Sequence, residues 1–255
     1  MSATANFLAF DLGAESGRAM LGRFDGRRLS LEEAHRFSNG PARVFSSLYW
    51  DALRLFDEMK KGLAAAASRA EGGLASIGVD TWGVDYALLG LDGALLENPY
   101  HYRDRRTKGV MEKLFSVVPR AEVFARTGIQ FMPFNTLYQL YATRLERPHL
   151  LDEARTLLLM PDLFHYWFTG RVVSEATIAS TTQFYDPLRG AWDRELFDRL
   201  GLPPRILPEI VPPSTWLGPL LPSVAEETGA GPARHLVAAG RRSGRAHHQR
   251  SDARL

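Results

Sequence analysis

The residues best suited to chemistry stand at the end of the first apolar run, where the chain reads FDLGAESGR. Asp11 offers a carboxylate that can hold a hydrated magnesium ion. Gly13 and Gly17 let backbone N–H groups come close to a phosphate, and Arg18 can bind phosphate oxygens. The residues therefore indicate a phosphate-binding turn, although an ordinary β-hairpin with an Asp-Leu-Gly turn fits them equally.

The elements that must position this turn follow from the apolar spacing. Residues 7–24 alternate as a strand, a tight turn and a second strand, and residues 27–37 read as a third strand. Asp51 is a good N-cap for a helix that ends near Arg69. That helix carries its apolar stripe at Ala52, Leu55, Phe56, Met59, Leu63 and Ala66.

Two short apolar runs, residues 74–80 and 86–93, are predicted to be neighbouring buried strands. The order β-β-β-α-β-β predicts an α/β fold with a mixed sheet and helices on its faces. Residues 161–170 predict a buried helix with Gly170 near its C-cap, because they are too few to span a membrane. The proline-rich residues 200–214 predict an extended connection along the surface.

Composition excludes several classes of protein. The 255 residues are 45% hydrophobic and 24% charged, which is usual for a soluble globular protein. The chain has no cysteine, and this rules out a disulfide framework, a thiolate metal site and a cysteine nucleophile. We expect a cytoplasmic protein with no membrane partner, because the sequence shows neither a signal peptide nor a run of transmembrane length.

The net charge of +2 is unevenly distributed. Residues 241–255 hold five arginines and a single acid, Asp252, which leaves 26 basic and 28 acidic residues in the rest of the chain. The body therefore has a net charge of −2, and we expect no nucleic-acid partner. Neither a GxxxxGK[ST] loop, a GxGxxG turn nor an HExxH motif occurs, and His247 and His248 are expected to be solvated.

Four further motifs follow the first hairpin in order. They are DTWGVDY at residues 80–86, YRDRRT at 102–107, TGIQFMPFNTLYQL at 127–140 and LLLMPDLFHYWFTG at 157–170. Together with DLGAESGR they closely resemble the N-terminal half of the rhamnulokinase members of the FGGY family of carbohydrate kinases. The resemblance runs from about Phe7 to about Ala238 and includes HRFSNG and ATIASTTQ.

This resemblance implies an actin-like ATPase (ribonuclease H-like) domain, with a mixed five-stranded sheet flanked by helices. It implies a second domain across a cleft, and transfer of the γ-phosphate of ATP to the 1-hydroxyl of L-rhamnulose. By resemblance, the hairpin residues Ala14, Glu15, Ser16, Gly17 and Arg18 contact the ATP phosphates, and Asp11 orders Mg²⁺ through water. Positioning and charge neutralisation dominate phosphoryl transfer, so these are suitable groups.

The DTWGVDY motif is implied to form half of the sugar site. Gly83 matches the position where the backbone meets the ketose, and its missing side chain lets a hydroxyl approach. Trp82 offers a flat face to the C–H side of a sugar, and Asp85 or Asp80 can accept hydroxyl hydrogen bonds. Trp82 could equally belong to the core, and Asp80 could cap a turn.

The next two motifs supply further candidates. Residues 103–106 (RDRR) are either a solvated charge run or an internal ion-pair network at the cleft floor, with Asp104 the best candidate to touch substrate. Gln130 and Asn135 are amides among apolar residues, which must find partners in sugar hydroxyls or in loop backbone.

The end of the chain departs from the family pattern. The family's general base is an aspartate in a His-Asp-Thr sequence, and no such sequence follows residue 238 here. We expect a domain at residues 1–238 and a disordered arginine-rich tail at 239–255, and we interpret the tail as the product of a shifted reading frame. No catalytic residue is therefore assigned to the chain.

Loss of a general base usually costs about 10²–10⁴-fold in rate, so we expect the chain alone to be inactive. Three alternatives remain open: a stand-alone sugar-binding module or a half that complements a separately encoded C-terminal domain, a non-functional fragment, and a kinase for another sugar of the family.

Overall fold

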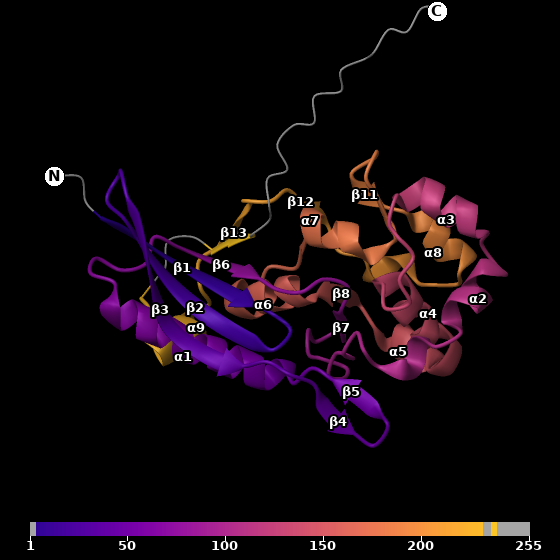
Figure 1. Cartoon of the computed structure of the whole chain (residues 1–255), viewed down its shortest axis with the longest axis horizontal. Helices are drawn as coiled ribbons and strands as arrows, with labels where there is room; N and C mark the ends of the chain where they lie inside the picture. Colours follow the sequence, from indigo (N-terminus) through magenta and orange to yellow (C-terminus); the bar gives the residue numbers. More distant parts are fainter. Residues whose placement is uncertain (1–3, 232–235, 239–255) are drawn as a thin grey trace, which may run out of the picture.

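The structure, a computed structural model, describes residues 4–231 and 236–238. Its centre is a mixed sheet with strand order β13-β14-β6-β1-β2-β3 (Figure 1). Strands β1, β2 and β3 pair antiparallel, whereas β6 runs parallel to β1, and β14 runs parallel to β6. The described part of the sheet has six strands rather than the five expected, because β13 pairs with β14 at its edge. The predicted tail at 239–255 lies outside the described residues.

The elements follow the chain in this order. The strands are β1 (Ala5–Leu12), β2 (Ser16–Phe24), β3 (Leu29–Ser38), β4 (Ala42–Val44), β5 (Ser47–Tyr49), β6 (Ser76–Asp80), β7 (Tyr86–Leu89), β8 (Thr156–Leu159), β9 (Ser174–Glu175), β10 (Tyr185–Asp186), β11 (Ala191–Trp192), β12 (Ile210–Val211), β13 (Trp216–Gly218) and β14 (Leu236–Ala238). The α-helices are α1 (Ala52–Arg69), α2 (Val110–Phe115), α3 (Arg120–Thr127), α4 (Thr136–Glu146), α5 (Pro148–Glu153), α6 (Met160–Thr169), α7 (Ala176–Ala179), α8 (Arg194–Arg199) and α9 (Pro222–Thr228). Short 3₁₀ helices are η1 (Arg105–Thr107), η2 (Ser180–Thr182) and η3 (Pro204–Ile206).

The predicted strand at residues 86–93 has a different partner from the one expected. Strand β7 does not join the main sheet, but pairs antiparallel with β8. The chain leaves β6 through a loop in which Val84 adopts a φ of 69°, a conformation that redirects the backbone. All four residues of β7 are buried, so its apolar run shows burial without indicating which strand lies beside it.

Helices α1 and α6 pack on the same face of the sheet. Phe10 of β1 stacks on Phe168 of α6 with ring centroids 5.8 Å apart, and Phe56 of α1 meets the same ring edge-on at 5.0 Å. The predicted bounds of both helices are confirmed, including the Asp51 cap and a left-handed C-cap at Gly170. No helix in the described part of the chain is long and apolar enough to span a bilayer.

A second core lies under β7 and β8, where α2, α4, α5 and α8 gather at the right of Figure 1. The proline-rich connection contributes to it, because Leu202, Ile206 and Leu207 are buried there. Part of that connection, β12, pairs with β9. The connection is therefore packed into the molecule, and the prediction that it only follows the surface was wrong.

The closest approach of α1 to the sheet occurs at Gly62. A Cβ at this position would stand 2.7 Å from the Cβ of Ala19 and 3.2 Å from the ring of Phe10. Alanine is favoured over glycine in a helix by about 1 kcal/mol, but overpacking a core costs about 1–3 kcal/mol. We expect Gly62→Ala to lower the free energy of unfolding by about 1–2 kcal/mol in urea titrations. Gly40→Ala, where no atom lies within 4 Å, is the control and should be nearly neutral.

A buried carboxyl group joins α6 to β9. Asp162 accepts hydrogen bonds from the Ser174 hydroxyl (2.7 Å) and the Glu175 backbone N–H (3.1 Å). Burial, with a smaller contribution from the charge of Glu175, raises the pKa of Asp162 to about 8. Because the folded pKa lies above the unfolded one, the stabilising contribution is complete below about pH 4 and is lost as the pH rises through about 8.

We therefore expect this carboxyl to lower the free energy of unfolding between about pH 4 and pH 8, with a slope of at most about 1.4 kcal/mol per pH unit. Asp162→Asn should flatten this slope, whereas the exposed Asp25→Asn should not. The check is a series of urea titrations across this range, and equal slopes in the native protein and Asp162→Asn would contradict the assignment.

Candidate functional site

The phosphate-binding candidates lie where β1 turns into β2. Asp11 and Arg18 stand opposite each other in the strand register, and their side chains form an ion pair. Both side chains remain partly exposed, at 47% and 42%, so a ligand can reach either of them. In the parallel pairing of β1 with β6, Asp11 lies beside Asp80, which places two carboxylates at the carboxyl ends of neighbouring strands.

Magnesium usually binds one or two carboxylates together with substrate phosphates, and Asp11 suits that mode. The described residues contain no group of three or more His, Cys, Asp or Glu side chains that could hold a metal ion by themselves. Asp11 thus offers one carboxylate to a magnesium ion, and its role as a metal partner stays a prediction.

The turn itself is closed by a hydrogen bond from the Gly13 N–H to the Ser16 carbonyl, at 2.9 Å. Among the described residues, the backbone N–H groups of Ala14 and Glu15 have no acceptor. Consecutive free N–H groups in a turn form a favourable concavity for an anion. The hairpin thus has backbone donors available for phosphate oxygens.

Gly17 has a different structural reason from the one expected. It lies within β2, and a Cβ there would overlap the ring of Phe37 on β3 at 2.3 Å. The glycine is required by the packing of β2 against β3, and this packing requirement is independent of any phosphate. Gly13 remains exposed in the turn.

The loop of residues 81–85 is organised around the buried carboxylate of Asp85. Its Oδ2 accepts from the indole N–H groups of Trp50 (2.6 Å) and Trp82 (3.0 Å) and from the Tyr102 backbone N–H (3.1 Å). Its Oδ1 accepts from the Gln139 amide at 2.7 Å. Three of these four bonds reach Oδ2 and one reaches Oδ1, and the side chain is buried. Asp85 therefore orients the loop, and its contact with a sugar hydroxyl stays a prediction.

The two indoles held by Asp85 form part of an aromatic row. Trp50 stacks on Trp82 with ring centroids 3.9 Å apart, and on its other side lies His101 at 4.2 Å. His101 in turn stacks on Tyr102 at 4.4 Å. Trp82 packs against the core but stays partly exposed, so the core interpretation applies to it, and its contact with a sugar stays a prediction.

Gly83 lies against η2. A Cβ on Gly83 would stand 3.1 Å from the Oγ1 and Cγ2 atoms of Thr181, which is tighter than an ordinary contact. The Thr181 hydroxyl accepts the Val84 N–H at 3.2 Å, and the Val84 carbonyl accepts the Thr136 hydroxyl at 2.7 Å. The left-handed conformation of Val84, unfavourable for a β-branched residue, is thus held from both sides.

The YRDRRT segment contains no ion-pair network among the described residues, so that interpretation was wrong. Asp104 is buried, and it accepts the backbone N–H groups of Leu48 (2.7 Å) and Arg106 (2.8 Å) as the cap of η1. Arg106 donates to the Gln139 amide oxygen at 3.0 Å and stacks on the Tyr100 ring at 3.9 Å. Arg106 contacts a neutral acceptor and an aromatic ring instead of a carboxylate, because Asp104 already accepts two backbone N–H groups. Its predicted contact with substrate is untested.

The two amides of GIQFMPFN are separated by the fold. Gln130 is exposed, so the expectation of a buried amide at this position was wrong. Asn135 is buried, and its Nδ2 donates to the Gln130 carbonyl and to the Gln183 side chain, both at 2.9 Å. The loop-backbone interpretation therefore describes Asn135, and a role for Gln130 in binding sugar stays a prediction.

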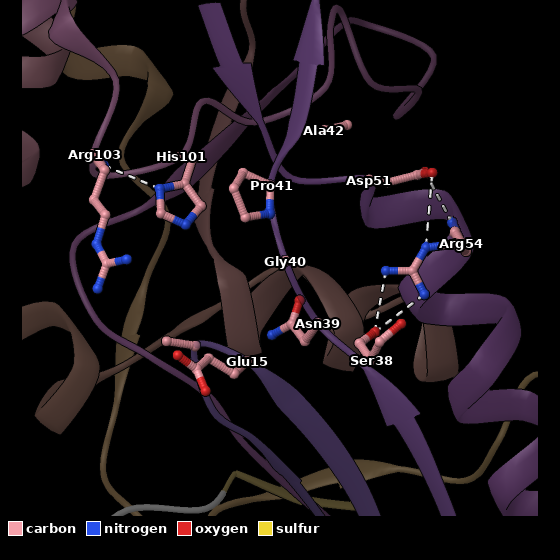
Figure 2. A pocket seen from close by; sticks show the side chains of 11 residues that line it. Glu15, Ser38, Asn39, Gly40, Pro41, Ala42, Asp51, Arg54, His101 and Arg103 are labelled. Carbon is pink, nitrogen blue, oxygen red and sulfur yellow. Dashed lines mark hydrogen bonds and ion pairs between the residues drawn. The ribbon is translucent and has the colours of Figure 1, made fainter.

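A pocket of about 590 Å³ opens between the hairpin and the 101–103 loop. Figure 2 shows its lining, which consists of Ala14, Glu15, Ser38, Asn39, Gly40, Pro41, Ala42, Asp51, Arg54, His101 and Arg103. The His101 Nδ1 accepts the Arg103 backbone N–H at 3.0 Å, so Nε2 carries the proton of the neutral ring. Burial, and then the charge of Arg103, lower the pKa of His101 to about 4, which keeps the ring neutral at physiological pH.

Sequence reasoning missed several residues of this region. Trp50 was expected only to end an extended segment, and His101, Gln139 and Asn39 were not singled out. Their neighbours in the site lie far away in the sequence: Trp50 and Gln139 bind an aspartate 35 and 54 positions distant. A local pattern contains no signal for such contacts.

Solved structures with this arrangement of elements are carbohydrate kinases. Gluconate kinase from Lactobacillus acidophilus superposes with a TM-score of 0.84 at 18% identity, over 93% of this chain and 48% of that one. A xylulose kinase from Rhodospirillum rubrum gives 0.81 at 20% identity, over 92% and 49%. A carbohydrate kinase from Novosphingobium aromaticivorans gives 0.78 at 28% identity, over 94% and 49%. The fold is therefore the actin-like ATPase fold found in carbohydrate kinases.

Sequence comparison then defines the family. The profile of the FGGY family of carbohydrate kinases, N-terminal domain, matches residues 6–241. Rhamnulokinase from Bacteroides thetaiotaomicron is 43% identical over 241 residues, covering 94% of this chain and 50% of that protein. Rhamnulokinase from Pectobacterium atrosepticum is 45% identical over 220 residues, covering 85% and 44%. This chain belongs to the FGGY family of carbohydrate kinases, and it spans about half the length of the curated relatives it matches.

Proposed function

We propose that this chain is the sugar-binding and phosphate-contacting half of an ATP-dependent ketose kinase, with L-rhamnulose as the sugar and its 1-hydroxyl as the acceptor. One observation carries the proposal. Strands β1 and β6 are parallel, with Asp11 beside Asp80, so the hairpin and the 81–85 loop leave from neighbouring strand ends. A phosphate bound at one and a sugar bound at the other would therefore meet.

The hairpin would receive the terminal phosphates. The free N–H groups of Ala14 and Glu15 donate to phosphate oxygens, together with Ser16 and Gly17 as the turn closes around the anion. Arg18 neutralises charge from its position opposite Asp11. A magnesium ion that arrives with ATP would be ordered through water by Asp11, and it would supply neutralisation of the phosphate charge.

The 81–85 loop would receive the sugar. Trp82 presents an apolar ring face whose orientation is fixed by the bond to Asp85. Gly83 leaves its backbone open to a hydroxyl. Asp85 and Asp104 act by holding this surface in place, since their oxygens already accept bonds from the protein. Gln130 stands at the exposed rim. No catalytic base is assigned among the described residues.

The proposed substrate is supported by the relatives. The two rhamnulokinases are more than 40% identical to this chain, whereas the gluconate and xylulose kinases are at most 20% identical. Binding should therefore favour L-rhamnulose over xylulose and gluconate. A stand-alone sugar-binding module is the second candidate, because the 81–85 loop and the partners of Asp85 all lie within the described residues.

Calorimetry on the chain tests this function. L-rhamnulose, xylulose and gluconate are titrated without nucleotide, and Mg·ATP is titrated separately. We expect L-rhamnulose to bind at least about tenfold more tightly than the other two, a difference of about 1.4 kcal/mol. Tighter binding of xylulose or gluconate would show that L-rhamnulose is not the preferred sugar. The absence of a heat signal with all three sugars would overturn the proposal that this chain binds sugar. Sugar binding without any Mg·ATP binding would favour the second candidate.

A further inference from the structure

The hairpin turn has few internal constraints of its own. A hydrogen bond from the Gly13 N–H to the Ser16 carbonyl closes it, and both Gly13 and Glu15 are exposed. The free N–H groups of Ala14 and Glu15 can serve as anion donors only if the peptide planes around them keep one orientation. Something outside the turn must provide that orientation.

Asn39, the residue after β3, reaches the turn at two points. Its backbone N–H donates to the Glu15 carbonyl at 2.9 Å, and its side-chain Nδ2 donates to the Gly13 carbonyl. These two carbonyls belong to the Gly13–Ala14 and Glu15–Ser16 peptides, so one residue fixes the peptide planes on both sides of the Ala14–Glu15 peptide. We propose that Asn39 is a positioning residue, which holds the hairpin in the shape that presents its N–H groups to an anion.

The bonding of the side chain shows that stability alone does not account for an asparagine here. Asn39 is buried, yet its Oδ1 has no hydrogen-bond partner among the described residues. A buried acceptor without a partner is unfavourable. The amide cannot be turned round to relieve this, because Oδ1 would then face the Gly13 carbonyl oxygen. The side chain therefore keeps its donor on the turn at the expense of its acceptor.

Asn39 is itself anchored to the core. Both terminal nitrogens of Arg54 donate to the Ser38 carbonyl, each at 3.2 Å, as the right side of Figure 2 shows. Arg54 lies in the first turn of α1, whose N-terminus is capped by Asp51. The path from α1 through Ser38 and Asn39 thus ties the exposed turn to a helix that packs on the core, and it forms one wall of the pocket.

The role of Asn39 in holding the turn rests on the geometry alone, whereas its effect on nucleotide binding rests on the proposed function. Two measurements distinguish these two claims. The first is hydrogen exchange at the amides of residues 13 and 39, both of which bond across the turn. The second is the affinity of the chain for Mg·ATP.

Asn6 provides a matched control. It is also a buried asparagine, and its Nδ2 donates to the carbonyls of Glu71 (2.7 Å) and Gly73 (3.2 Å). It lies near the opposite end of β1 from the hairpin. Asn39→Ala and Asn6→Ala therefore remove the same kind of bond, but only the first removes it from the turn. Asn39→Asp keeps the size of the side chain and replaces the donor with a carboxylate oxygen, so it also adds a negative charge next to the Gly13 carbonyl.

We expect Asn39→Ala and Asn39→Asp to speed exchange at residues 13 and 39 by roughly five- to tenfold relative to the strand amides of β1, in line with the loss of one hydrogen bond. Asn6→Ala should leave that ratio unchanged. Affinity for Mg·ATP should fall in the Asn39 variants alone. Unchanged local exchange in both Asn39 variants, or an equal change in Asn6→Ala, would overturn the positioning role. A native chain that does not bind Mg·ATP, with the exchange result intact, would instead count against the proposed function.

Discussion

Replacing Asp85 with alanine is expected to lower the free energy of unfolding by about 2–4 kcal/mol. Two effects oppose each other. Removing a buried carboxyl recovers the desolvation cost, which raises the pKa of Asp85 to about 6. Against this, the Trp50 and Trp82 indoles and the Tyr102 N–H lose their acceptor, and each buried orphan donor costs about 1–3 kcal/mol. The cost of three donors without an acceptor outweighs the recovered desolvation energy.

The same variant should disorder the aromatic row. The indole N–H protons of Trp50 and Trp82 should exchange slowly in the native protein and rapidly in Asp85→Ala, as NMR can measure. Asp85→Asn keeps one acceptor oxygen and should fall between the two. L-rhamnulose binding should weaken with the loss of indole order, because the Trp82 ring is no longer held in one orientation. Unchanged indole exchange in Asp85→Ala would contradict the role of Asp85 in holding the loop.

The pH dependence of this variant has a defined sign. The folded pKa of Asp85 lies above the unfolded one, so its contribution to stability is complete below about pH 4 and is lost as the pH rises through about 6. Buried His101 and His165 act in the opposite sense, because burial lowers the pKa of each to about 4. Their contribution is lost as the pH falls from about 6.5 through 4. Subtracting the pH dependence of the free energy of unfolding of Asp85→Ala from that of the native protein isolates the contribution of the Asp85 carboxyl.

Replacing Asp11 with asparagine should weaken binding of Mg·ATP by about 10- to 100-fold, the usual effect of losing an outer-sphere partner of a bound metal. The reason is the lost negative charge, since magnesium prefers carboxylate oxygen. The same change releases Arg18 from its ion pair. Binding of ATP in the presence of a chelator should therefore stay equal or improve, because the freed guanidinium can meet phosphate.

This divergence between metal-bound and metal-free ATP separates a magnesium role from simple damage to the hairpin, which would weaken both. Asp25→Asn changes the net charge equally at the far end of β2, where Asp25 caps a turn, and should alter neither affinity. Calorimetry with and without magnesium makes the comparison. Equal weakening of both forms in Asp11→Asn would show that Asp11 supports the hairpin without ordering a metal ion.

The elements that the sequence predicted well are those whose evidence is local. The hairpin around Asp11, the helix that follows Asp51 and the helix that ends at Gly170 each show an apolar period and a cap within a few residues. Their bounds were confirmed because periodicity and capping act over one or two turns of chain. The family resemblance rests on motifs of the same kind, and sequence comparison confirms it.

Pairings between distant segments were not accessible in this way. The run at residues 86–93 looked like a neighbour of β6, but its partner is β8, nearly 70 residues later. The charge of Asp104 suggested ion pairs, whereas backbone N–H groups 2 and 56 positions away bind it. Gln130 looked buried among apolar neighbours and lies on the surface. Apolar or charged character does not specify which group will lie alongside.

The hairpin and the 81–85 loop show which features come from residue types and which come from the tertiary structure. Residue types alone indicated that Asp11 to Arg18 suits phosphate, because that chemistry resides in the groups themselves, and the family resemblance indicated that Trp82 and Gly83 suit a sugar. The parallel register of β1 with β6 brings the two sites to one edge of the sheet. Asp85 and Asn39 then hold them through bonds that span from 17 to 54 residues of sequence. Contacts at such separations form only when the whole chain is packed, so folding places the groups whose chemistry the sequence already contains.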